Sequence, residues 1–355
     1  MPDTPARAKM GHPHPVRDAG AVAEEWEELI ANQGGHIERV IRSLSSGSAA
    51  ARSRLAASWQ RSWQKHGLDP AQTPRRAPDT VRLRERRDQL GPVLAVAAPR
   101  LNELFVMLGQ CGCGVLLTDA EGVVIDSRCA AGDADVFRNW GLTPGTDWSE
   151  AAQGTNGIGT CLAERRAVTI HRDQHYLAGN IGMSCIDAPI FGPDAALVAA
   201  LDVSSARADH TEGFNRLIEA MVAQVAHQIE SELFRSAFSR HRILLAGTGG
   251  DAQSAALLAV DDDDVVVGAT REARRLHGLE LAGTIRPRPI ADVLGRSGTG
   301  EGLVRAERAA VIRALTRADG NVSQAAQALG MSRATLYRRM KRLGIDDFRP
   351  GLSRI

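Results

Sequence analysis

Basic side chains gather near the end of this chain, where they could neutralise phosphates. Nine Lys and Arg residues lie between residues 303 and 345, against only Glu307 and Asp319, which gives a local net charge of about +7. The whole chain of 355 residues has a net charge of only +1. Cationic groups concentrated in one segment are the electrostatic footprint of a nucleic-acid-binding domain.

Turn and capping residues divide this basic segment into three helices. The first is expected over residues 304–318. The second is expected over 324–329 with Ser323 as its N-cap, and the third over 333–343 with Ser332 as its N-cap. Glycines between them supply left-handed turns. The residues of the first helix that we expect to be buried are Val304, Ala309, Ile312 and Leu315.

The third helix has two chemically different faces. Leu336, Met340 and Leu343 recur at i, i+4 and i+7 and form an apolar stripe. The opposite face carries Arg333, Tyr337, Arg338, Lys341 and Arg342. A short helix, a glycine turn and a capped basic helix together predict a helix-turn-helix.

The run GNVSQAAQALGMSRATLYRRM at residues 320–340 resembles the Fis-type helix-turn-helix family, whose partner is DNA. By this resemblance the positions that meet DNA are Ser332, Arg333, Thr335, Tyr337, Arg338 and Lys341. Arg333 and Arg338 can reach guanine edges or phosphates, while Lys341 and Arg342 suit phosphates. The alternative is a helical bundle with a merely basic surface.

Residues 92–240 show the pattern of an α+β domain with an antiparallel sheet flanked by helices. A helix over 93–108 leads into the expected strands, which are 115–119, 123–126, 167–171, 184–191 and 196–203. A last helix over 211–238 has one apolar stripe. That stripe can pack on its own sheet, on the same helix of a second subunit, or on both, and we expect a homodimer.

Several motifs within residues 36–240 resemble the GAF domain of the acetoin-catabolism regulator family of sigma-54 activators. They are QGTNGIGTCLA at 153–163, VTIH at 168–171, HYL at 175–177 and LDVS at 201–204, in that order. The resemblance implies a sensor with a pocket for a small organic effector between sheet and helices. The candidate effector-binding residues are Asn156, Thr160, His171, His175 and Cys185.

The sequence indicates neither a metal nor another cofactor. His171 and His175 are four residues apart, but a metal site needs three or four convergent ligands. Cys111 and Cys113 are expected on one strand face. Five cysteines in a chain of this length indicate reduced thiols rather than a disulfide framework. No nucleophile–base pair is evident, so the chain is not expected to be an enzyme.

The sensor and the helix-turn-helix are separated by about 60 residues. This interval contains no GxxxxGK[ST] phosphate-binding loop, so the ATPase of sigma-54 activators is not expected here. It faintly resembles the start of a PAS domain, with a hairpin over 256–268 and a helix over 270–276. The expected organisation is a disordered tail (1–20), a helical N-terminal region (21–91), a GAF-like sensor (92–240), a linker with the PAS-like fragment (241–302) and a helix-turn-helix domain (303–355).

These patterns together predict a cytoplasmic transcription regulator that binds DNA under the control of a small organic effector. No apolar run reaches the roughly 18 residues of a membrane span, and no membrane contact is expected. RNA polymerase is a further partner to consider. The alternatives are an architectural DNA-binding protein with a vestigial sensor, a redox-responsive regulator and, least supported, an enzyme that uses the GAF-like pocket.

Overall fold

The computed structural model describes residues 33–46, 48–73, 77–205, 212–247, 255–295 and 302–345. The expected tail at 1–20, the start of the helical region and residues 346–355 lie outside the described residues. The chain forms two compact units, one of Met1–Asp263 with Val267–Arg286 and the other of Asp264–Val266 with Pro287–Ile355.

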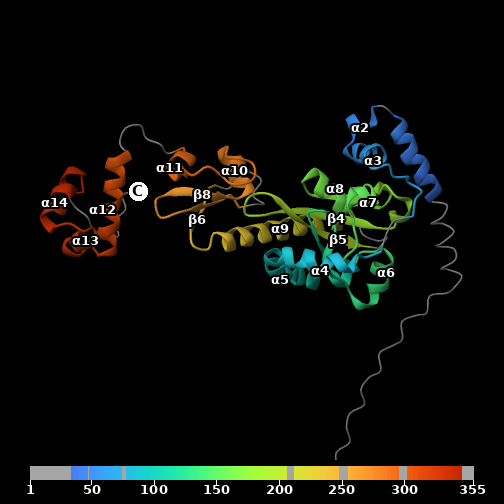
Figure 1. Cartoon of the computed structure of the whole chain (residues 1–355), viewed down its shortest axis with the longest axis horizontal. Helices are drawn as coiled ribbons and strands as arrows, with labels where there is room; N and C mark the ends of the chain where they lie inside the picture. The colour runs from blue at the N-terminus through green and yellow to red at the C-terminus, as the bar shows by residue number, and fades with distance from the viewer. Residues whose placement is uncertain are drawn as a thin grey trace, which may run out of the picture. The chain divides into compact units, whose positions relative to one another are not determined.

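The centre of the first unit is a five-stranded sheet (Figure 1). Its strands are β1 (Cys113–Asp119), β2 (Val124–Arg128), β3 (Val168–His171), β4 (Ser184–Phe191) and β5 (Leu197–Ser205). They pair in the order β2-β1-β5-β4-β3, and every pairing is antiparallel. The predicted α+β sensor with an antiparallel sheet is confirmed, and each of the five expected strands is present.

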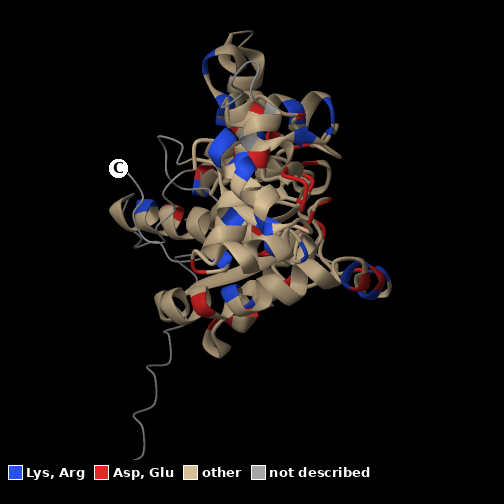
Figure 2. Cartoon of the chain, turned by 90° about the vertical axis from the view of Figure 1, so that its left-hand side faces the viewer, with Lys and Arg blue, Asp and Glu red and all other residues tan. Residues whose placement is uncertain are grey.

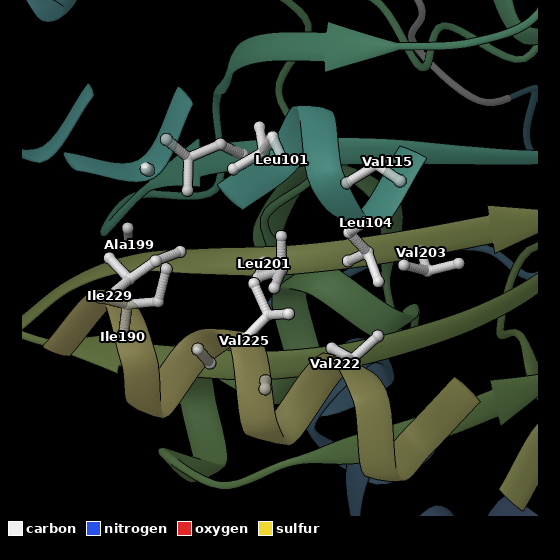
Figure 3. Close-up of a cluster of buried hydrophobic side chains, with 14 of the residues drawn as sticks. Leu101, Leu104, Val115, Ile190, Ala199, Leu201, Val203, Val222, Val225 and Ile229 are labelled. Carbon is white, nitrogen blue, oxygen red and sulfur yellow. The ribbon is translucent and has the colours of Figure 1, made fainter. Parts of the chain in front are cut away.

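One face of the sheet packs against two long helices, α5 (Gly91–Leu108) and α9 (Glu212–Ala237). Figure 3 shows Leu101 and Leu104 of α5 and Val222, Val225 and Ile229 of α9 meeting strand residues. The strands contribute every second side chain to this core, because side chains alternate between the two faces of a sheet. Those labelled in Figure 3 are Val115, Ile190, Ala199, Leu201 and Val203.

The apolar stripe of α9 is buried against the sheet of its own chain. Ile218, Val222, Val225, Ile229 and Leu233 are all buried in this cluster. Of the arrangements left open by the sequence, packing on the sheet is therefore the one seen.

Helix α5, extended by the 3-10 turn η1 (Gly109–Cys111), is long and apolar enough to cross a membrane by length and composition. Within the described residues one face of this helix lines the core, through Val93, Ala97, Leu101, Leu104 and Leu108. Its apolar character is therefore accounted for in part by packing on the sheet and α9.

The opposite face of the sheet is covered by α6 (Ala134–Asn139), α7 (Glu150–Gln153) and α8 (Gly157–Glu164). Its apolar core includes Leu116, Phe137, Trp148 and Ile158. Cys111 and Cys113 do not share a strand face as expected. Cys111 lies in η1 and only Cys113 belongs to β1, because Gly112 between them takes a left-handed conformation.

The N-terminal helices dock on the sensor. They are a helix at residues 33–45, α2 (Ala49–Arg52), α3 (Arg54–Gln64) and α4 (Thr80–Gln89). Trp59 is buried with Tyr176 and Leu177, and its indole Nε1 donates to the Gln174 carbonyl at 2.9 Å. Trp63, four residues on, is 49% exposed, so only one of the two tryptophans anchors this contact.

The PAS-like fragment contains the expected hairpin and helix, β7 (Leu257–Val260), β8 (Val265–Ala269) and α10 (Arg271–His277). It also contains β6 (Arg242–Leu245), β9 (Arg288–Pro289) and α11 (Ile290–Val293), in a sheet of order β6-β7-β8-β9. Phe234 near the end of α9 packs against Leu257 and Ala259 of this fragment.

The C-terminal part has three helices, α12 (Gly302–Arg317), α13 (Val322–Ala328) and α14 (Arg333–Arg342). Its core contains Val311, Ala314, Leu315, Ala325, Ala326, Leu336 and Met340. Two expectations were wrong in detail. Asn321, not Ser323, caps α13, because its carboxamide oxygen accepts from the Ser323 and Gln324 amides. Val304 is 52% exposed, since the described buried residues of α12 begin at Val311, about two turns later.

Replacing Ile229, which is fully buried, with Ala should lower the unfolding free energy of the sensor by about 2–5 kcal/mol. The matched control is Arg235→Ala on the same helix, which should cost less than about 0.5 kcal/mol because Arg235 is exposed. Urea unfolding followed by tryptophan fluorescence is the measurement. All five tryptophans precede residue 149, so the signal follows the sensor. Equal losses in the two variants would contradict the described core.

Candidate nucleic-acid interface and sensor site

The start of α14 is fixed by a serine cap. The Ser332 hydroxyl accepts from the Thr335 amide at 3.2 Å, and the Ser332 and Thr335 hydroxyls lie 2.9 Å apart. Such a cap satisfies one of the amides that a helix leaves unpaired at its N-terminus. Both residues were expected to meet DNA, and both hold the first turn of the helix in place.

The outward face of α14 presents basic and aromatic side chains. Arg333, Arg338 and Lys341 are exposed, as is Tyr337, while Leu336 and Met340 face the core. The guanidinium carbon of Arg333 lies 5.6 Å from the centre of the Tyr337 ring, a cation–π distance. The face predicted from the sequence is therefore present, with Arg333 oriented by its aromatic neighbour.

Arg342 is exposed, but it forms an ion pair with another helix of the protein. Its guanidinium lies 2.6 Å from both carboxylate oxygens of Glu307 on α12, and Arg339 approaches the same carboxylate at 3.0 Å. The expected phosphate contact by Arg342 therefore competes with this ion pair. Elsewhere charges of both signs are intermixed over the chain (Figure 2), in line with its net charge of +1.

In the sensor, two of the five candidate effector residues lie against each other. His175 Nδ1 donates to the Arg172 carbonyl at 2.9 Å, so its Nε2 is left to accept from the Cys185 thiol at 3.5 Å. Burial lowers the pKa of His175 to about 4, which keeps this ring neutral. Burial also raises the pKa of the Cys185 thiol well above its usual range, so the thiol keeps its proton.

A pair of buried carboxyl groups continues this cluster, and sequence reasoning missed it. Asp187 on β4 and Asp202 on β5 are direct cross-strand partners, and both are buried. The Ser204 hydroxyl lies 2.8 Å from Asp202 and 3.2 Å from the Cys185 sulfur. Burial raises the pKa of Asp202 to about 7, and burial together with the neighbouring Asp202 also raises the pKa of Asp187 well above its usual range. Asp187 therefore holds a proton at neutral pH.

Gly157 at the first turn of α8 makes room for this pair. A side chain there would lie against Asp187 Oδ2 and 2.5 Å from Cys185 Cβ. A glycine at this position therefore lets the helix approach the carboxyl group.

Asn156, Thr160 and His171 are placed around the same helix but are bound by other protein groups. Asn156 caps α8, accepting from the Gly159 amide and donating to the Gly154 carbonyl, both at 2.8 Å. Thr160 donates to Glu150 at 3.1 Å and lines a small cavity of about 130 Å³. His171 Nδ1 lies 2.6 Å from the Ser184 hydroxyl.

A second missed network ties the N-terminal helices to α7. Ser58 donates to Glu150 at 2.7 Å, and Arg61 pairs with the same carboxylate through two contacts of 2.8 and 3.0 Å. The sequence gave no signal for this pairing, because Arg61 and Glu150 are 89 residues apart.

The described residues include no group of three or more His, Cys, Asp or Glu side chains placed to hold a metal ion. All five cysteines lie in the described part of the chain, and none of them is in a disulfide. Burial raises the thiol pKa of Cys129, Cys161 and Cys185, which disfavours the reactive thiolate.

Two protein families match this chain, one over the sensor and one over the C-terminal helices. Residues 38–230 match the family described as the N-terminal domain of MimR. The chain belongs to this family. Residues 303–343 match the bacterial regulatory protein family of Fis type. The sensor with its docked N-terminal helices is thus a MimR N-terminal domain, followed by a Fis-type DNA-binding helix-turn-helix as predicted.

Two relatives of this MimR-type chain are named as transcription regulators. It is 34% identical over 277 residues to an acetoin catabolism regulatory protein of Cupriavidus necator, covering 74% of this chain and 41% of that protein. It is 30% identical over 196 residues to MimR of Mycolicibacterium smegmatis, an activator of a propane 2-monooxygenase operon, covering 54% of this chain and 32% of MimR. The chain thus spans less than half the length of these relatives. The family resemblance expected from the sequence is confirmed.

A solved structure of the E. coli DhaR(N)–DhaL complex also aligns with this MimR-type chain. The alignment covers 67% of this chain and 80% of that one, at 14% identity and a TM-score of 0.46.

The acid pair predicts a pH dependence that Asp187→Asn should reduce. Above pH 4 the folded sensor holds protons that the unfolded chain releases, so its stability should fall as the pH rises from about 5 to 8. The carboxamide introduced by this substitution has nearly the shape of the protonated carboxyl group but carries no titratable proton. Relative to this variant, the parent should lose up to about 1.4 kcal/mol of unfolding free energy per pH unit.

Urea unfolding of the parent and the variant at several pH values measures this difference. Other groups with a shifted pKa, such as His175 and Glu230, are present in both proteins, so their contribution cancels. The control is Asp135→Asn, since the Asp135 side chain is exposed. If both variants keep the parental slope, the acid pair does not hold the extra proton.

Proposed function

We propose that this chain is a sequence-specific DNA-binding transcription regulator controlled by a small organic effector in its sensor, and that it acts without hydrolysing ATP. The observation that carries the proposal is α14, whose first turn is capped by Ser332 and whose exposed face presents Arg333, Arg338 and Lys341. A recognition helix inserts such a face into the major groove. A regulator of this kind works in the cytoplasm, where its DNA is.

Effector control is supported by membership of the MimR N-terminal domain family. The names of two relatives describe them as regulators of acetoin catabolism and of a propane 2-monooxygenase operon. The coupling would require the effector to bind two states of the protein with different affinity. The rival is an architectural DNA-binding protein with a vestigial sensor. DNA footprinting with and without catabolic substrates distinguishes them, since only a regulator changes occupancy.

Action without ATP hydrolysis is supported by the interval between the two matched families. Residues 231–302 are too few for an ATPase domain and contain no phosphate-binding loop. The redox alternative is weakened by the raised pKa of the buried Cys161 and Cys185 thiols.

A homodimer is supported by apolar side chains left exposed where α5 ends and α9 begins. Val106 is 79% and Met107 54% exposed near the end of α5, and Leu217 lies in the second turn of α9. The ion pair of Arg100 with Glu232 at 2.5 Å joins these two helices, which pack on the same face of the sheet. A second copy would cover this patch.

Arg333→Ala should weaken binding to an operator selected from random DNA by about 1–3 kcal/mol and relax base preference at one position per half-site. Lys341→Ala should weaken binding to all sequences alike and reduce the salt dependence by about one unit. The measurement is a salt titration of specific and non-specific DNA binding.

The control for both variants is Arg313→Ala, an exposed arginine on α12 outside the recognition helix. Base preference should be unchanged in this control. If Arg333→Ala and Lys341→Ala bind the selected operator like the parent, α14 is not the reader and the proposed function fails.

The double variant Val106→Lys with Met107→Lys should convert a dimer into a monomer while leaving sensor stability nearly unchanged, because both side chains are exposed. Light scattering gives the mass, and tryptophan fluorescence gives the melting temperature. The control is Val81→Lys on α4, also exposed and outside the patch. A dimer that survives the double variant would show that another surface joins the subunits.

A further inference from the structure

A cavity of about 570 Å³ lies within the first unit, at a place not expected from the sequence. One wall is the edge of the sensor, where the turn after α8 and strand β4 contribute Arg165, Ala188 and Phe191. A second wall is α9, and the third is the PAS-like fragment around α10. The volume falls within the usual range of small-molecule sites.

The α9 wall is a regular face of the helix. Ala223, His227, Glu230 and Ser231 recur at i, i+4, i+7 and i+8, next to the stripe that packs on the sheet. Alanines at 167, 188, 223, 255 and 282 also line the cavity. Their small side chains leave the space that longer ones would fill.

Specific contacts fix the PAS-like fragment against the sensor and α9, and so define the shape of the cavity. The Gly283 amide of the fragment donates to the Asp194 carbonyl in the β4–β5 turn at 2.8 Å. Arg274 is buried and donates to the carbonyls of Ala269, Glu280 and Gly283 at 2.7–2.9 Å. Phe234 of α9 packs into the fragment from the other side.

The charges that line the cavity favour an anion. Of the four arginines in the lining, Arg275 is paired with Glu272 and Arg166 with Glu164. Arg165 and Arg271 then stand against the single carboxyl group of Glu230. Burial raises the pKa of Glu230 to about 7, so its negative charge is partly lost at neutral pH. The Phe191 amide donates to Glu230 at 2.9 Å, which fixes this carboxyl group in the wall.

Arg271 is the best-placed cation. Its guanidinium carbon lies 4.0 Å from the centre of the Phe191 ring, and it forms no ion pair with any carboxylate among the described residues. A guanidinium stacked on an aromatic ring keeps its N–H edge available, and this edge matches a carboxylate through two parallel hydrogen bonds.

We propose that this cavity binds a small organic carboxylate, with its carboxylate on Arg271 and its short apolar part against the alanines of the wall. A ligand there contacts α9 and the PAS-like fragment together, so occupancy links the sensor to the segment that leads to the helix-turn-helix. The site lies outside the cluster of His175 and Cys185. The binding itself does not depend on the proposed function, so loss of DNA binding would leave it intact.

The test is calorimetric titration of the full chain with sodium acetate, butyrate and benzoate, each compared with its neutral amide. At least one carboxylate should bind, and its amide should bind about tenfold more weakly or not at all. Arg271→Gln should weaken the carboxylate by about tenfold or more. Glu230→Gln keeps an acceptor for the Phe191 amide but removes the negative charge, so it should strengthen binding.

Ala223→Leu places a larger side chain in the cavity and should abolish binding without a change of charge. The matched controls are Ala220→Leu, one turn away and exposed, and Arg235→Gln near the end of α9, also exposed; both should bind like the parent. Tryptophan melting of each variant verifies that it is folded. Absence of binding by all three carboxylates, equal binding of acid and amide, or unchanged binding in Ala223→Leu would each overturn the proposal.

Discussion

The contact of α9 with the sensor sheet is the interaction on which the rest of the first unit depends. Its buried stripe from Ile218 to Leu233 holds α5 and the strands in one core. Phe234 then carries the same helix into the PAS-like fragment. Because one rigid helix serves both, a change in its position on the sheet reaches the fragment. An adjacent face of α9, which begins at Ala223, is left to line a cavity.

Local signals predicted most of the fold. Strand β4 has the expected bounds of 184–191, because an apolar run between turn residues defines it. The cap of α13 was misplaced by two residues, since both Asn321 and Ser323 are good cap formers and only the backbone decides between them. Val304 fits the apolar period of α12 but lies beyond the reach of α13 and α14.

The sensor site was less accessible to sequence reasoning. His175 and Cys185 were both named, but their contact depends on how the loop after β3 returns to β4. Asp187 and Asp202 meet only through the register of β4 with β5, which no local pattern specifies. A signal did exist in the single Asp within the otherwise apolar β4. A charge in a buried strand requires a partner or a proton, and here it has a proton.

Glu307 has a consequence for how the DNA-binding part discriminates among sites. By holding Arg339 and Arg342, it removes two cations from the general attraction to phosphate backbones. Arg333, Arg338 and Lys341, which we propose to contact DNA, are not held by this carboxylate. Every chromosome offers a vast excess of non-cognate sequence, so a regulator gains more from a low background affinity than from a high total one. Under the proposed function, one acidic residue on α12 would thus raise selectivity for the operator by lowering the affinity for non-cognate DNA.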